Sequence, residues 1–170
     1  VIRICPLFET RKSAFVPSNF NIDDCPFMVL TSKLASAIMC PTGISTPQGA
    51  GTVSNPYLIR SLGELRWISQ DSNRWGLVYK QTANIDADPS INLNNGAGFI
   101  PIGNASTAFT GKYNGQGFWI DDLHINRSSS NEIGLFGYVN NAEIINVKLY
   151  DASITGSTRV GACLLYTSPS

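Results

Sequence analysis

His124 is the single histidine of the chain, and two adjacent carboxylates, Asp121 and Asp122, come shortly before it. An imidazole can act as a general base near neutral pH, and paired carboxylates can share acid and base roles. His124 lies between apolar Leu123 and Ile125, so strand alternation turns its side chain toward solvent. Adjacent aspartates in a strand point to opposite faces and form no acid–base pair. Without a second histidine or a cysteine partner, we expect no zinc site and no catalytic residue.

A group of oxygen-bearing side chains, Asn84, Asp86 and Asp88, has the residue types that bind calcium. Their spacing lacks the number of carboxylates that a defined calcium loop supplies. A turn in which an aspartate accepts a hydrogen bond from its own backbone accounts for the same residues. We therefore expect a turn at this point, and neither a metal nor a cofactor.

Trp119 is the residue that best fits a ligand contact. It lies between Phe118 and Ile120, so in a strand it faces away from at least one of them. An outward indole beside Asp121 and His124 could stack on a sugar ring. Packing of the indole against the preceding turn explains the residue equally well. Trp119 is therefore a hypothetical glycan contact.

Composition excludes two broad classes of partner. Twelve basic residues balance twelve acidic ones and charged residues make up 14% of the chain, without a basic run that would bind nucleic acid. No apolar stretch approaches the roughly 20 residues that span a bilayer as a helix. Low charge with abundant Gly, Asn, Ser and Thr is typical of an all-β surface protein with many turns.

Two stretches of the chain repeat each other without a gap, and a fixed period of this size is typical of stacked repeats. Residues 120–125 match residues 144–149 at an offset of 24, and after a short insertion Ile133 and Gly134 match Val160 and Gly161 at an offset of 27. The repeat predicts that Ile120 stacks on Ile144 and Leu123 on Val147. The apolar positions of the two stretches are Ile120, Leu123 and Ile125, and Ile144, Val147 and Leu149.

Short apolar segments separated by turn residues predict an all-β fold. Residues 56–59, 77–79, 99–102, 109–113 and 118–120 read as strands, and glycines such as Gly115 and Gly117 supply tight corners. Ser61 and Glu64 have the spacing of a capping box, which predicts one short helix ending near Asp71. An antiparallel sandwich also has many short strands. The recurring apolar triplet instead favours a right-handed parallel β-helix, with the helix as its N-terminal cap.

The segment Gly134-Leu135-Phe136-Gly137 resembles the signature of the GLUG repeat family, which occurs in bacterial surface and secreted proteins. Residues 55–59, 79–86 and 109–120 are similar to other segments of that family. The resemblance covers residues 50 to 162, and it departs from the family at Gln81, where leucine is usual. It implies a parallel β-helix on the cell surface, structural glycines and aliphatic residues, and no catalytic residues.

The two ends of the chain differ from its centre. Residues 1–49 show no periodicity and are expected to be a poorly ordered leader or linker, or translated DNA outside its proper frame. Residues 163–170, read as codons, resemble a sequencing adapter, so they are expected to be an artefact that ends a metagenomic gene fragment. The repeat domain is therefore predicted to span residues 50–162 and to be truncated. It contains no cysteine, so no disulfide framework is expected.

These observations predict a non-enzymatic segment of a bacterial surface or secreted protein that serves as an adhesive or spacer repeat array. The expected location is extracellular or on the cell surface. Its partner is unknown, and a glycan or a protein of a host or environmental surface is the expectation. The alternative is a β-helix polysaccharide lyase or hydrolase, by analogy of fold. That enzyme requires Asp, Arg or Lys clustered along one outward ladder.

Overall fold

A computed structural model describes residues 42–161, and from Ile44 onward they belong to one compact unit. The fold is all-β, with short strands and few helices, and every pairing between its named strands is parallel. This pairing excludes the antiparallel sandwich. The predicted adapter-like tail at 163–170 and most of the predicted leader lie outside the described residues.

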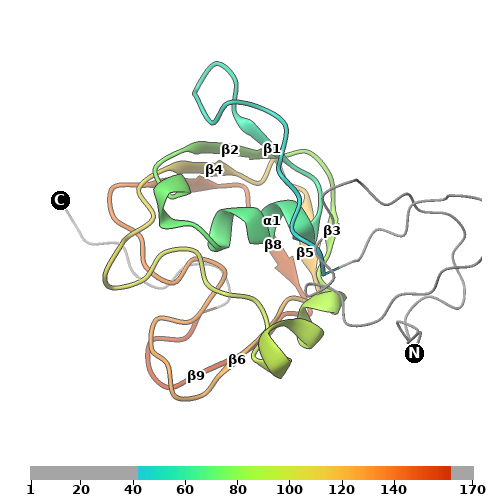
Figure 1. Ribbon diagram of the computed structural model, residues 1–170, viewed down its shortest axis with the longest axis vertical. Helices are drawn as coiled ribbons and strands as arrows, with labels where there is room; N and C mark the ends of the chain where they lie inside the picture. The colour runs from blue at the N-terminus through green and yellow to red at the C-terminus, as the bar shows by residue number, and fades with distance from the viewer. Residues whose placement is uncertain (1–41, 162–170) are drawn as a thin grey trace, which may run out of the picture. The chain divides into compact units, whose positions relative to one another are not determined.

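Three parallel sheets make up the fold (Figure 1). Their short strands pair with segments well separated in the chain, while the intervening residues connect one sheet to the next. The first sheet contains β1 (Tyr57–Ile59), β2 (Val78–Gln81), β4 (Lys112–Asn114) and β7 (Glu143–Ile145), in that order. The second contains β3 (Ile85–Asp86), β5 (Trp119–Asp121) and β8 (Lys148–Tyr150), and the third contains β6 (His124–Arg127) and β9 (Ser153–Gly156).

The predicted stacking of Ile120 on Ile144 and of Leu123 on Val147 is wrong. Ile120 pairs with Leu149, and Ile144 pairs with Tyr113 in the first sheet. Ile120 and Ile144 therefore lie in different sheets, and the true repeat between neighbouring strands is longer than the sequence match indicated. The predicted match of Ile133 with Val160 is confirmed, because these two residues form a parallel bridge.

The wrong register has a local structural reason. Asp122, Asn146 and Asp151 each follow a strand and adopt a left-handed backbone, with φ of 54°, 55° and 45°. Aspartate and asparagine tolerate this conformation better than most residues. These three steps from one sheet to the next thus share a pattern of strand, polar corner and strand. The sequence match aligned the step β5–β6 with the step β7–β8, which is one sheet out of place.

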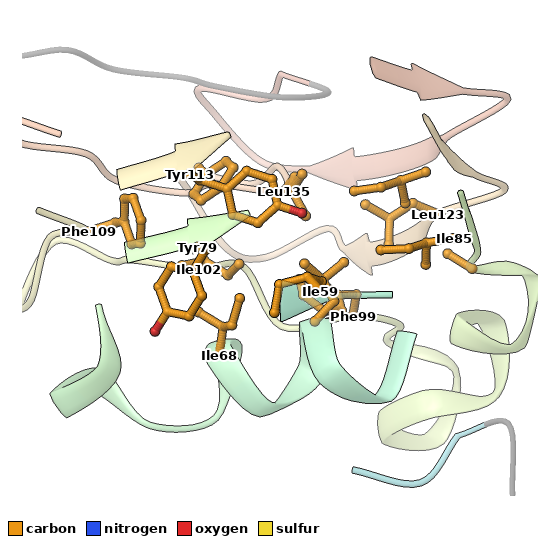
Figure 2. Packing of buried hydrophobic residues seen from close by; sticks show 14 of the residues in the cluster. Ile59, Ile68, Tyr79, Ile85, Phe99, Ile102, Phe109, Tyr113, Leu123 and Leu135 are labelled. Atoms are coloured by element: carbon orange, nitrogen blue, oxygen red, sulfur yellow. The ribbon is translucent and has the colours of Figure 1, made fainter. Parts of the chain in front are cut away.

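Inward side chains form continuous columns between the sheets (Figure 2). In the first sheet, Tyr57, Tyr79 and Tyr113 occupy paired positions, with ring centroids 5.9 Å and 6.4 Å apart. Burial raises the pKa of Tyr79, whose hydroxyl donates to the carbonyl oxygen of Arg74 at 2.6 Å. Full burial of one such side chain contributes about 1.5–3 kcal/mol. The columns of the second and third sheets are Ile85, Ile120 and Leu149, and Ile125 and Ile154.

Gln81 is fully buried at a position where the resembled family has leucine. Its Nε2 donates to the carbonyl oxygens of Ala83 and Trp119, at 2.9 Å and 3.1 Å. Its Oε1 accepts from the hydroxyl of Tyr113 at 3.3 Å. Because each polar atom has a partner, burial of this amide carries little penalty. Gln81 thereby joins the first sheet to the second.

The predicted helix is present as α1 (Leu62–Ser69). Ser61 is its N-cap and accepts from the backbone N–H of Glu64 at 3.3 Å. Glu64 reaches the backbone N–H of Arg60 at 2.6 Å, one residue before the position that a capping box uses. The inward residues Leu65 and Ile68 are fully buried in the same core as the strands. In Figure 1, α1 lies between β1, β2 and β4 above and β6 and β9 below.

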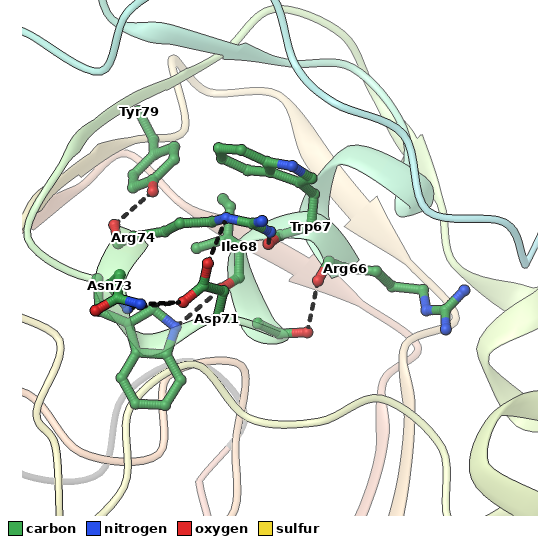
Figure 3. Close-up of polar contacts among 9 residues, drawn as sticks. Arg66, Trp67, Ile68, Asp71, Asn73, Arg74 and Tyr79 are labelled. Carbon is green, nitrogen blue, oxygen red and sulfur yellow. Dashed lines mark hydrogen bonds and ion pairs between the residues drawn. The ribbon is translucent and has the colours of Figure 1, made fainter. Parts of the chain in front are cut away.

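A polar cluster around Arg74 connects the end of α1 to the first sheet (Figure 3). The contact with the sheet is the hydrogen bond from the Tyr79 hydroxyl to the carbonyl oxygen of Arg74. The guanidinium of Arg74 lies 3.8 Å from the ring centroid of Trp67 and donates to the carbonyl oxygen of Trp67 at 2.5 Å. Its Nε lies 3.2 Å from Asp71 Oδ2. Trp75 Nε1 donates to the carbonyl oxygen of Ile68 at 2.9 Å. Two 3₁₀ segments, η2 (Ser72–Arg74) and η3 (Asp88–Gly96), complete the helical structure of the described residues.

The glycines predicted to be structural lie where backbones approach each other. A Cβ on Gly134 would be 2.2 Å from the carbonyl oxygen of Gly161, so only glycine fits beside the Ile133–Val160 pairing. A Cβ on Gly115 would meet the carbonyl oxygen of Asn146 at 2.4 Å, and one on Gly137 that of Glu132 at 2.5 Å. Gly117 has a positive φ of 79°. Leu135 and Phe136, the other residues of the signature, are fully buried.

The fold includes residues before position 50. Gln48 forms an antiparallel bridge with Leu58, and the N–H of Ser45 donates to the carbonyl oxygen of Gly63 at 3.2 Å. The compact unit thus begins at Ile44, whereas the predicted repeat domain begins at residue 50.

Candidate functional site

The outer face of the second sheet carries an exposed aromatic pair. Ile120 of β5 and Leu149 of β8 point into the core, so alternation turns Trp119 and Tyr150 outward. Their side chains are 43% and 51% exposed, and their rings meet edge to face with centroids 6.1 Å apart. Trp119 faces away from Ile120, as its position next to that residue in the strand predicted. We define Trp119 and Tyr150 as the aromatic pair.

The backbone of Trp119 is fixed on both sides. Its N–H donates to Asn84 Oδ1 at 3.2 Å, and its carbonyl oxygen accepts from Gln81 Nε2 at 3.1 Å. These contacts come from the end of β2 and from the connection between β2 and β3. These two hydrogen bonds fix the backbone of Trp119 and do not involve its indole ring. A platform fixed in this way loses little conformational entropy when a ligand stacks on it.

Carboxylates gather beside the aromatic pair. Asp86 and Asp121 are paired between β3 and β5, and Asp121 is paired with Tyr150 between β5 and β8. Partial desolvation and the negative charges of Asp121, Asp151, Asp88 and Asp86, in that order, raise the pKa of Asp122. Asp122 lies in a left-handed corner after β5, so the strand alternation behind the expectation that Asp121 and Asp122 point to opposite faces does not apply to it.

Replacement of Asp122 by asparagine is expected to raise the melting temperature at neutral pH. Folding raises the pKa of Asp122, so its contribution to stability is complete below the unfolded pKa of about 4 and is lost as the pH rises through the folded pKa. An asparagine would keep the left-handed corner, since Asn146 has φ 55°. The melting temperature of Asp122→Asn relative to the parent, measured by circular dichroism, should therefore increase from pH 3 to pH 7.

Salt provides the control for this comparison. At roughly 1 M salt the screening length falls to about 3 Å, so repulsion among the carboxylates weakens. The advantage of Asp122→Asn at pH 7 should then shrink. A gain that is the same at every pH and salt concentration would indicate a backbone effect and contradict the electrostatic explanation.

The other polar residues singled out from the sequence have structural roles. Asp86 Oδ1 accepts from the backbone N–H of Asp88 at 3.1 Å, which confirms the predicted turn. His124 is half-buried rather than fully turned to solvent, because η3 packs against β6. The backbone N–H of His124 donates to Ser90 Oγ at 2.8 Å. Among residues 42–161, no group of three His, Cys, Asp or Glu side chains is arranged to hold a metal ion.

Sequence reasoning missed Tyr150 as a member of this site. The residue pairs with Asp121, but the predicted repeat placed β8 one sheet away. Alternation alone could have turned Tyr150 outward, since it follows Leu149 directly. Its position beside Trp119 required the correct register, in which Leu149 lies opposite Ile120.

The aromatic pair and the carboxylates beside it offer contacts for a flat polar ligand. Exposed aromatic rings present apolar faces with a polar edge, and carboxylate oxygens accept hydrogen bonds from hydroxyl groups. A sugar ring offers both an apolar face and hydroxyl donors. The aromatic pair and the aspartates beside it can therefore contact one or two sugar units on the surface of the sheet.

Comparison with known proteins gives two relatives of much greater length. The chain is 43% identical over 119 residues to Halomucin of Haloquadratum walsbyi, a match that covers 66% of this chain and 1% of that protein. It is 37% identical over 109 residues to a protein of Evansella cellulosilytica named "Putative Gly-rich membrane protein", covering 63% of this chain and 12% of that protein. The chain thus spans a small part of the curated relatives that it matches.

No family model matches the sequence. No solved structure matches it either. The names of the two relatives support a coarse location for this chain, in association with the cell envelope. Among residues 42–161, none of the helices is both long enough and apolar enough to cross a membrane.

Proposed function

We propose that this chain is a non-enzymatic segment of a long extracellular or cell-surface protein, built as a right-handed parallel β-helix of the GLUG type. The parallel pairing of β4 with β7, β5 with β8 and β6 with β9 supports this fold, because each of the last two passages of the chain adds one strand to every sheet. Parallel crossovers are right-handed in about 98% of cases. The small share of each relative that is matched supports a place within a longer chain.

The helix α1 acts as the N-terminal cap of this proposed β-helix. Its apolar residues Leu62, Leu65 and Ile68 are buried against the strand core. A solenoid needs such a cover because the apolar side chains of its first coil would otherwise face water. The polar cluster around Arg74 holds the cover in place.

Adhesion through glycan contact is the role that the aromatic pair favours over a passive spacer. A spacer requires only buried columns and a polar surface, and an exposed tryptophan beside an exposed tyrosine adds nothing to it. The observation that carries the proposal is the edge-to-face contact of Trp119 and Tyr150 at 6.1 Å on a fixed backbone. A glycan of neutral sugars is the expected ligand, because the neighbouring carboxylates would repel an acidic one.

A glycan array probed with the complete protein tests this proposal. Trp119→Ala and Tyr150→Ala should each weaken binding about tenfold, which corresponds to the roughly 1.4 kcal/mol of one aromatic contact. Ile145→Ala is the matched control, since Ile145 is also exposed but lies on β7 in the first sheet. Its binding should equal that of the parent.

Two results would contradict the proposal. Equal binding by the parent and both aromatic variants would remove the aromatic pair from the site. Cleavage of a glycan bond would instead support the second expectation, a polysaccharide lyase or hydrolase.

A further inference from the structure

A cavity away from the aromatic pair lies between the end of α1, the loop at residues 100–104 and the segment at residues 127–133. Its volume is about 490 Å³, within the range of about 300–1,000 Å³ that small-ligand sites occupy. The cavity opens to solvent and has both polar and apolar walls. One of the apolar walls is Trp75, a buried indole whose Nε1 is already bonded to the carbonyl oxygen of Ile68.

Arg127 contributes the cationic group of this cavity. It is the last residue of β6, and its guanidinium is partly buried. Nε donates to the carbonyl oxygen of Phe99 at 3.3 Å, whereas Nη2 is enclosed without a hydrogen-bond partner. Burial also lowers the pKa of this guanidinium. The enclosed Nη2 leaves this charged group short of hydrogen bonds, and an anion on the cavity side of the guanidinium would stabilise its charge.

The neighbouring carboxylate is engaged elsewhere. Glu132 lines the same cavity, but its Oε1 lies 3.4 Å from Arg159 Nη1. Arg127 therefore has no carboxylate partner among the described residues. A ligand carboxylate would form a charge-assisted pair with this guanidinium.

The other polar residues of the cavity indicate what kind of molecule would carry the ligand carboxylate. Asn104 and Asn131 already use Oδ1 as acceptors, for the backbone of residues 106 and 107 and for Thr158. Their amide nitrogens remain as donors, and Ser130 adds a hydroxyl. A ring of hydroxyl and amide groups beside one arginine and one indole wall matches a polyhydroxylated acid.

We propose that this cavity binds one carboxylated sugar unit, such as a hexuronate, with its carboxylate on Arg127. This site is separate from the aromatic pair and has the opposite charge preference. The inference stands independently of the glycan-contact proposal.

Titration calorimetry of the full chain with methyl glucuronoside tests the site. Methyl glucoside has the same ring without the carboxylate, and acetate has the carboxylate without the ring. The glucuronoside should bind at least about tenfold more tightly than either, because a hydrogen bond to a charged group contributes roughly 1.5–3 kcal/mol. Arg127→Gln should lose that preference, and Arg60→Gln, at an arginine that does not line the cavity, should retain it.

Asn131→Ala provides a second variant should Arg127→Gln fold poorly, because Asn131 is exposed. It should weaken glucuronoside binding about threefold or more, as expected for one lost hydrogen bond. Trp119→Ala should leave this binding unchanged, which separates this site from the aromatic pair. The inference is overturned by equal affinity for glucuronoside and glucoside, by acetate binding as tightly as the glucuronoside, by unchanged binding in Arg127→Gln, or by absence of saturable binding.

Discussion

Gly103→Ala is expected to destabilise the protein by about 2–4 kcal/mol. Gly103 has φ +81°, a conformation that costs a residue with a Cβ roughly 1 kcal/mol. An added Cβ would also lie 2.1 Å from the carbonyl oxygen of Tyr138 and 2.9 Å from the backbone nitrogen of Phe109. Those two groups are hydrogen-bonded to each other at 2.9 Å, so the methyl group would force neighbouring backbones apart. Such overpacking costs a further 1–3 kcal/mol, roughly.

Gly96→Ala is the matched control for this effect. Gly96 has φ +87°, but nothing lies within 4 Å of the position where its Cβ would be. It should therefore lose only the roughly 1 kcal/mol of the backbone term. Urea unfolding of both variants measures the difference. Equal losses would show that the backbone contact at Gly103 relaxes freely, contrary to the close packing of neighbouring strands described above.

Phe136→Ala is expected to cost about 3–5 kcal/mol, the usual loss for removing a buried aromatic side chain. Phe136 is fully buried, and its ring lies 5.1 Å from that of Phe109 and 5.4 Å from that of Tyr113. These partners come from segments farther back in the chain. Removal of the Phe136 ring would leave a cavity beside Phe109 and Tyr113. The surrounding backbone is held by hydrogen bonds to neighbouring strands, so it cannot move in to fill this cavity. The midpoint of urea unfolding should fall accordingly.

Tyr150→Ala is the control for this experiment, because it removes an aromatic ring that is 51% exposed. Its loss of stability should be below about 1 kcal/mol, as for most surface substitutions. A loss in Phe136→Ala no larger than that in Tyr150→Ala would contradict the placement of the GLUG-like segment in the core. The comparison thus tests burial directly.

Local structure was predictable where short-range chemistry determines it. The helix at residues 62–69 follows from the Ser61 cap and the apolar spacing that comes after it. The strands follow from alternation, which correctly turned Ile120 inward and Trp119 outward. The turn at Asp86 follows from the preference of aspartate to accept a backbone hydrogen bond. Each of these features depends on residues within a few positions of one another.

The register between strands was not predictable to the same degree. Corners between the sheets use polar left-handed residues, so a pattern of strand and corner fits several offsets. The sequence match placed Ile144 opposite Ile120, and the structure places Leu149 there. The pairing of Ile133 with Val160 was predicted correctly because glycine is required beside it, which adds a steric constraint that the polar corners lack.

The candidate sites depend on register and so could be predicted only in part. Trp119 was found from alternation within its own strand. Its partner Tyr150 comes from β8, which the wrong register separates from β5, and Asp86 comes from β3, which the sequence match did not cover. The cavity of Arg127 combines the end of α1 with two later segments, and no short-range pattern connects these parts of the sequence.

The register of β5 tests the account most directly. Nuclear Overhauser effects between backbone protons of an isotope-labelled sample identify the neighbour of each strand. We predict backbone contacts that place Ile120 opposite Leu149 and Tyr113 opposite Ile144. Backbone contacts that place Ile120 opposite Ile144, or antiparallel pairing of β5 with β8, would contradict it.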